Sequence, residues 1–291
     1  MSESTRTLRA GQWKCYIRFC NQYGLDPYKS SPNQLALYST HLSTFMKASS
    51  IITYIQAVNF QMVMLGLPSV SLKEPLLKMT LQGISRLPVN NLHQRDPMLP
   101  SHLSKIYDVL DVKNDVEIIV YVSSLLMFRT LLRVSHVVKS PHTLKIKDVV
   151  MESWGMVIKV NSSKTSRTTP QDVPVYKVND KTLCPVYWLL HLFKRFPRPS
   201  SSPLFAVDSH PMPYSEFAIN FNKLVRRSGI VGKFSSHSLR RGGATFMAHH
   251  GCSLQEIKSR GNWKSNCVFS YIQPTLTHKK KSDYKVASFI A

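Results

Sequence analysis

The sequence predicts a mainly α-helical protein with a small antiparallel β-sheet, arranged as an N-terminal helical bundle followed by an α+β domain. Apolar residues recur at helical spacing through most of the 291 residues, and only the stretch around 149–177 alternates as strands do. With 43% hydrophobic residues, the chain is long enough for about two packed domains.

The N-terminal part is predicted to be helical throughout. Apolar side chains follow one stripe over residues 8–23 and again over 50–66, and a shorter helix is expected around 74–84. Ser31 and Pro32 have the chemistry of a helix N-cap and of the first helical position. These segments together predict a small helical bundle.

Three prolines and several polar residues mark residues 87–100 as a linker. The linker separates the bundle, residues 1–86, from a second domain over residues 101–275. The remaining residues, 276–291, form a tail that is first basic and then apolar.

The second domain is predicted to combine helices with a small sheet. Helices near 101–111 and 115–139 precede two or three strands, whose turns are expected at Trp154–Gly155 and around 161–171. Helices then resume at 184–195, 214–228, 238–250 and 253–260.

The charge balance indicates a polyanionic partner. Lysine and arginine outnumber aspartate and glutamate by 38 to 16, a net charge of +22. Residues 1–97 carry +6 and the remainder +16, so both domains are positive. Such a chain gains affinity for a nucleic acid because each neutralised phosphate releases counterions.

Cysteine usage and apolar segments favour a soluble intracellular protein. Five scattered cysteines without a CxxC pair argue against a disulfide framework or a zinc ribbon. The N-terminal residues lack the apolar core of a secretory signal. The longest apolar run, residues 116–128, is shorter than the ~20 residues of a membrane helix, so it predicts a buried helix.

The stretch HSLRRGGAT, residues 237–245, places His237 three residues before Arg240. Positions i and i+3 share one helix face, so both side chains can converge on one small target. Arginine offers a fork of donors suited to phosphate, and histidine exchanges a proton near neutral pH. Taken alone, the spacing is more typical of a polar helix start on a solvated face.

Four further residues accompany this pair in chain order. Arg133 lies in an apolar segment predicted to be helical, where a charge is costly unless it has a partner. Lys164 is predicted on a turn between strands, and Trp263 precedes Tyr271 by eight residues. Singly, these residues fit a structural ion pair, a turn lysine and core aromatics. Together, in a strongly basic chain, they predict one site.

The motifs TLLRVS, SSKT, LCPVYWLL, HSLRRGGATF, GNWKS and SYI resemble, in this order, those of the tyrosine recombinase (phage integrase) family. Tryptophan before the tyrosine is similar to Cre recombinase. The wording of the closing block is most similar to Crypton- and DIRS-type recombinases of eukaryotic mobile elements. The resemblance covers most of the chain and implies a core-binding bundle followed by an integrase-like catalytic domain.

The resemblance implies site-specific recombination, in which DNA is cut and rejoined through a 3′-phosphotyrosine intermediate. Tyr271 would attack the phosphate and release a 5′-hydroxyl. Arg133 and Arg240 would donate to the non-bridging oxygens, where charge builds up in the transition state. Lys164 would be the general acid that protonates the leaving oxygen.

The remaining members of the set are His237, as acid or base near the nucleophile, and Trp263, as a wall of the site that offers its indole N–H. Neither a metal nor another cofactor is expected, because the phosphotyrosine retains the bond energy. One residue departs from the family: His136 stands where an acidic residue usually follows the first arginine by three positions.

Double-stranded DNA is the expected partner, held by both domains, with the helices at 8–23 and 50–66 as candidate readers of sequence. Strand exchange implies a homotetramer on two DNA sites. The apolar end of the tail would dock either on a neighbouring protomer or on its own domain. No membrane association is expected, and a eukaryotic host would place the protein in the nucleus.

Other functions stay open at this point. His136 motivates a DNA-binding protein that descends from a recombinase and has lost its activity. A type IB topoisomerase uses similar chemistry as a monomer. A metal-dependent nuclease is the weakest alternative, because the sixteen carboxylates form no paired motif and the eleven histidines are scattered.

Overall fold

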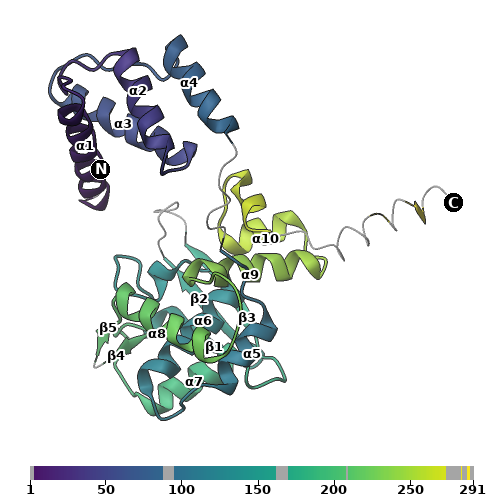
Figure 1. The fold of residues 1–291 in the computed structure, drawn as a ribbon. Helices are drawn as coiled ribbons and strands as arrows, with labels where there is room; N and C mark the ends of the chain where they lie inside the picture. The colour runs from purple at the N-terminus through teal and green to yellow at the C-terminus, as the bar shows by residue number, and fades with distance from the viewer. Residues whose placement is uncertain are drawn as a thin grey trace. The chain divides into compact units, whose positions relative to one another are not determined.

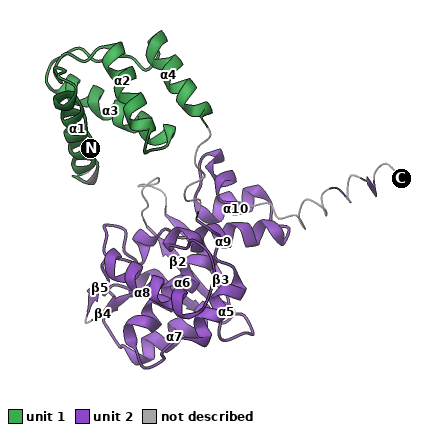
Figure 2. Cartoon of the chain, in the orientation of Figure 1, with its two compact units in different colours: residues 1–92 green, residues 93–291 purple. Residues whose placement is uncertain are grey.

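The computed structural model describes residues 3–87, 95–161, 170–207 and 209–272, together with Asp283, Ala287 and Ser288. The chain divides into two compact units, residues 1–92 and 93–291 (Figure 2). Each unit has its own hydrophobic core.

Unit 1 is helical. Tyr16, Tyr38 and Ile55 lie at the centre of its core with less than 2% of their surface exposed. Ser31 caps the second helix, as predicted: its Oγ accepts a hydrogen bond from the backbone N–H of Gln34. The helices are α1 (Glu3–Gln22), α2 (Pro32–Ser43), α3 (Ala48–Met64) and α4 (Pro75–Arg86) (Figure 1).

Unit 2 combines helices with two small sheets (Figure 1). Its α-helices are α5 (Pro100–Asp108), α6 (Asp115–Thr130), α7 (Pro185–Arg195), α8 (Tyr214–Arg227), α9 (Ser236–His249) and α10 (Leu254–Gly261). Its 3-10 helices are η1 (Val134–His136), η2 (Ile146–Asp148) and η3 (Asn266–Ser270). Its strands are β1 (Val149–Glu152), β2 (Gly155–Val160), β3 (Gln171–Tyr176), β4 (Ala206–Val207) and β5 (His210–Pro211).

Helix α6 forms the centre of unit 2. It includes the apolar run 116–128, is buried on all sides, and packs against α7, α8, α9 and β3. Strands β1, β2 and β3 pair antiparallel in that order. The predicted fold class, mainly α with a small antiparallel sheet, is therefore confirmed. The two-residue strands β4 and β5 were not expected.

The predicted helix over 115–139 is wrong at its C-terminal end. Helix α6 stops at Thr130, and Leu131 adopts a left-handed conformation with a φ of 56°. Arg133 then lies in extended backbone before η1, outside any α-helix. Leu132 and Val137 are apolar because their side chains are buried, so the apolar pattern continues beyond the end of the α-helix.

Two further findings concern possible membrane spans and the cysteines. None of the helices in the described residues is long and apolar enough to cross a membrane. All five cysteines are free thiols, and they range from buried to exposed.

Candidate active site

Two glycines in α9 set the position of the site. A Cβ on Gly242 would lie 1.6 Å from the Met98 carbonyl oxygen, and one on Gly243 would lie 2.2 Å from that of Phe128. Only glycine permits so close an approach of α9 to α6 and to the segment that precedes α5. The approach brings Arg240 against the C-terminal end of α6.

Arg240 is 3% exposed and is held by the ends of two helices. Its Nη1 donates to the Leu131 carbonyl, just past α6, and its Nη2 donates to the Gly261 carbonyl at the end of α10, 2.6 Å away. Carbonyls at helix C-termini lack helical partners and carry the negative end of the helix dipole. They therefore stabilise a buried cation that pairs with no carboxylate among the described residues.

Aromatic rings enclose the same guanidinium. Its carbon lies 4.0 Å from the centroid of the Trp263 ring, within the range of a cation–π contact. The Tyr271 ring lies 4.9 Å from Trp263 and 4.7 Å from the His237 ring, between centroids. A Cβ on Gly261 would lie 2.0 Å from the Trp263 ring, so the glycine there leaves the space that the indole occupies.

Four of the predicted site residues line one cavity of about 270 Å³: Arg133, His237, Arg240 and Tyr271. Residues that are distant in sequence thus meet at one place, from the chain after α6, from α9 and from the residue after η3. Trp263 packs against Arg240 and, with its ring tilted by 59°, against Tyr271. Lys164 lies outside the described residues.

The site is strongly electropositive. None of the ion pairs among the described residues includes Arg133 or Arg240. Burial and, after it, the charge of Arg133 lower the pKa of Arg240 to about 10, although Tyr271 opposes the shift. Burial of the ring and then the charges of Arg240, Arg241 and Arg133 lower the pKa of His237 below its ordinary value of 6.5.

His136 has a defined local contact. It is 2% exposed, and its Nδ1 lies 3.2 Å from the Arg133 carbonyl oxygen. Because a carbonyl only accepts, Nδ1 carries the proton in this contact. The backbone N–H of His136 reaches the same oxygen at 2.9 Å. The imidazole therefore braces the backbone of Arg133.

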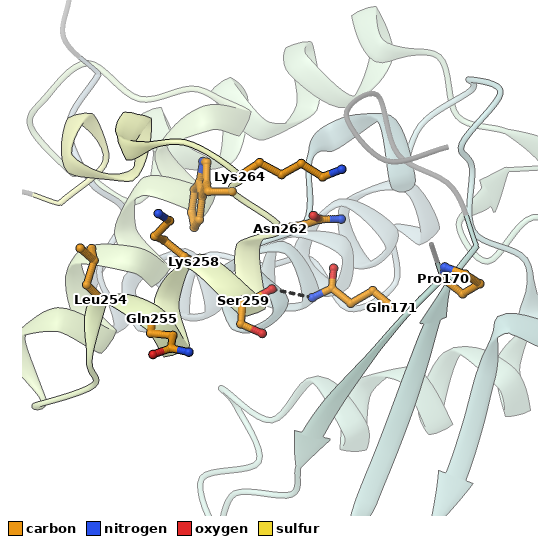
Figure 3. Close-up of a pocket in the computed structure, with 9 residues that line it drawn as sticks. Pro170, Gln171, Leu254, Gln255, Lys258, Ser259, Asn262 and Lys264 are labelled. Carbon is orange, nitrogen blue, oxygen red and sulfur yellow. Dashed lines mark hydrogen bonds between the residues drawn. The ribbon is translucent and has the colours of Figure 1, made fainter. Parts of the chain in front are cut away.

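A second hollow of about 760 Å³ lies between α10 and the start of β3 (Figure 3). Lys258, Asn262 and Lys264 line it together with Trp263. Gln171 closes its edge by donating from Nε2 to the Ser259 carbonyl, 2.8 Å away. The sequence does not mark these lysines as site residues: Lys258 lies in α10, which carries no motif, and Lys264 stands in the GNWKS motif, where Trp263 is the predicted site residue.

The structure offers no evident metal site in the parts it describes. There, no group of three or more histidine, cysteine, aspartate or glutamate side chains lies close enough to hold an ion.

The fold thus brings two arginines, a histidine and a tyrosine together at one cavity of unit 2. Residues 98–275 match the phage integrase family, and the chain belongs to that family. Comparison with curated protein sequences gave no match.

Solved structures share the fold at low sequence identity. The Tn1549 transposon integrase in complex with transposon right end DNA superimposes with a TM-score of 0.63 at 12% identity, covering 99% of this chain and 95% of that one. A lambda integrase dimer bound to a COC′ core site gives 0.65 at 15%, covering 94% and 89%. XerA recombinase gives 0.52 at 18%, covering 98% and 92%.

Proposed function

We propose that the protein is a site-specific DNA recombinase that cuts and rejoins DNA through a 3′-phosphotyrosine intermediate. The observation that carries this proposal is the cavity in which Tyr271 and His237 face two arginines that form no ion pair with any carboxylate in the described parts of the chain. A scissile phosphate would supply the negative charge that balances them.

The chemical roles follow from this arrangement. The Tyr271 phenol attacks phosphorus and gives its proton to neutral His237, while the bond to the 5′-oxygen breaks. Arg240 uses two of its N–H groups on carbonyls, and its other donors, which lie beside Tyr271, are available to the non-bridging oxygens. Arg133, in the chain between α6 and η1, donates to the same phosphate oxygens. In the reverse step a 5′-hydroxyl attacks the phosphotyrosine and frees Tyr271.

Two predicted residues complete the set. Lys164 protonates the leaving 5′-oxygen. Trp263 packs at the side of the site and holds the Arg240 guanidinium towards the phosphate through a cation–π contact. Arg133, Lys164, His237, Arg240, Trp263 and Tyr271 are thus the proposed catalytic set.

The partner is double-stranded DNA, held by a core-binding domain over residues 1–86 and a catalytic domain over 101–275. The net charge of +22 supports this partner, as do the DNA complexes of the Tn1549 and lambda integrases. A homotetramer on two sites, integration or excision of a Crypton-type mobile element, and a nuclear location are the finer parts of the proposal.

The experiment is covalent trapping on DNA. A duplex selected for binding from a random-sequence pool is nicked near its centre, so that the cleaved end diffuses away, and is incubated with the protein in EDTA. Wild type is expected to form an adduct that survives a denaturing gel. Tyr271→Phe, which removes the nucleophilic oxygen, is expected to form none.

Tyr214→Phe is the matched control, since Tyr214 is 51% exposed at the start of α8, and it should form the adduct normally. An adduct with Tyr271→Phe would assign the nucleophile elsewhere. Tight binding without an adduct from wild type would favour a DNA-binding protein that has lost its activity.

A further inference from the structure

Arg241, next to Arg240 in α9, makes contacts that the proposed reaction does not use. It is 5% exposed, and its guanidinium joins two distant parts of unit 2. Nη1 donates to the Arg95 carbonyl at 3.1 Å, and Nη2 donates to the Ser270 carbonyl at 2.6 Å. Burial lowers the pKa of Arg241, and the nearby Asp96 carboxylate opposes that shift.

The Ser270 carbonyl belongs to the peptide bond that joins Ser270 to Tyr271. Thr245 donates from Oγ1 to the Tyr271 carbonyl at 3.0 Å and so holds the next peptide. Both peptides that flank the Tyr271 Cα are therefore bound to α9. Together with His237, whose ring contacts the phenol ring, Arg241 and Thr245 occupy positions i, i+4 and i+8 on one helix face.

The other arm of Arg241 reaches the segment that enters unit 2. Asp96 donates its backbone N–H to the Lys233 carbonyl at 2.9 Å, and Met98 donates to the Ser238 carbonyl at 2.9 Å. The segment from Arg95 to Met98 is thus fastened along the start of α9. Arg241 is the side chain that links this entering segment to the peptide of the nucleophile.

We propose that Arg241 is a positioning residue of the recombination site. It fixes the Ser270–Tyr271 peptide so that the phenol faces the cavity, and it ties that peptide to the segment entering unit 2. The inference rests on the proposed function of Tyr271. It assigns Arg241 no contact with DNA, so its loss should slow the chemical step and leave DNA affinity unchanged.

The test compares Arg241→Met with a closely matched control, Arg198→Met. Arg198 also donates both Nη atoms to carbonyls, those of Pro203 and Leu204 at 3.1 Å each. In both arginines, Nε is buried and has no hydrogen-bond partner among the described residues. Each substitution thus removes two hydrogen bonds to backbone carbonyls, but only Arg241 lies beside Tyr271.

The measurements are the dissociation constant for DNA and the single-turnover rate of adduct formation at saturating DNA. Circular dichroism shows first that each variant is folded at the temperature used. Arg241→Met is expected to slow adduct formation by about 10²-fold at an unchanged dissociation constant, as for a nucleophile displaced by about 1 Å. Arg198→Met is expected to keep the wild-type rate. Guanidinium at millimolar concentration should partly restore the rate of Arg241→Ala and leave that of Arg198→Ala unchanged.

Arg241→Lys keeps the proposal testable if the methionine variant does not fold. Lysine retains the charge but cannot reach both carbonyls, so the rate should fall by about tenfold. A folded Arg241 variant that forms the adduct at the wild-type rate, or equal losses in the Arg198 variants, would overturn the proposal. Absence of an adduct from wild type would instead count against the proposed function.

Discussion

Arg240 illustrates how backbone carbonyls and an aromatic ring stabilise a buried cation. The carbonyls of Leu131 and Gly261 and the face of Trp263 surround it. A carboxylate in their place would compete with any phosphate for the same donors. Backbone carbonyls and a ring stabilise the guanidinium and leave its remaining N–H groups for an anionic ligand.

The position of His237 leads to a prediction about its protonation. Burial of the ring and the charges of Arg240, Arg241 and Arg133 lower its pKa from 6.5. The free protein should therefore hold a neutral imidazole at pH 7, able to accept the phenol proton. Nuclear magnetic resonance titration of the His237 ring should give a pKa below 6.5.

Arg133→Met should raise the pKa of His237, because it removes one nearby positive charge.

The lowered pKa of His237 in the wild-type protein also has a consequence for stability. The unfolded chain binds the proton first, so the free energy of unfolding should fall as pH drops from 6.5 through the lower pKa of the folded state. A wild-type pKa at or above 6.5 would contradict this electrostatic description.

Sequence reasoning could propose a set of residues but not all of their placements. His237 and Arg240 stand in one motif, and their spacing on a helix predicts that they share a face. Arg133 was placed inside a helix, because the apolar pattern does not reveal the left-handed turn at Leu131. Arg241 was missed as a functional residue, since its partners are backbone carbonyls, which no sequence pattern marks.

At the scale of elements, the crossing of α9 with α6 gives the site its shape. The crossing depends on contact between backbones, which explains why glycines stand in the middle of a helix where they are otherwise unfavourable. Element types were predictable from periodicity, whereas the two-residue strands β4 and β5 are too short to show any.

Gly243→Ala should therefore destabilise unit 2. The added Cβ would lie 2.2 Å from the Phe128 carbonyl oxygen, and overpacking of this kind costs about 1–3 kcal/mol. Gly83→Ala in α4 is the control, because its Cβ would meet nothing within 4 Å. That change should stabilise unit 1 by about 0.5–1 kcal/mol through helix propensity.

Urea denaturation followed by circular dichroism measures both free energies. Equal unfolding midpoints for Gly243→Ala and wild type would show that α9 and α6 can move apart without loss of stability. That result would contradict the conclusion that only glycine permits their close approach.

At the scale of the whole molecule, charge is the property that extends beyond the site. The net charge of +22 is spread over both units. The hollow between α10 and β3 adds Lys258 and Lys264 (Figure 3), and Trp263 lines the same hollow. A DNA strand that places one phosphate at Tyr271 would bring neighbouring phosphates within reach of such side chains. These lysines are therefore expected to act on affinity, and to do so independently of base sequence.

The double variant Lys258→Gln, Lys264→Gln should bind every DNA duplex more weakly. Each phosphate contact adds about one unit to the slope of the logarithm of affinity against the logarithm of salt concentration, so the slope should become shallower by about 2. The control is the double variant Lys29→Gln, Lys194→Gln, which removes the same amount of charge. Lys29 forms an exposed ion pair with Asp26, and Lys194 lies in the last turn of α7. Fluorescence anisotropy from 50 to 200 mM salt, roughly the range over which such slopes are resolved, measures both. Equal slopes in the two double variants would mean that only net charge matters and that the hollow contacts no phosphate.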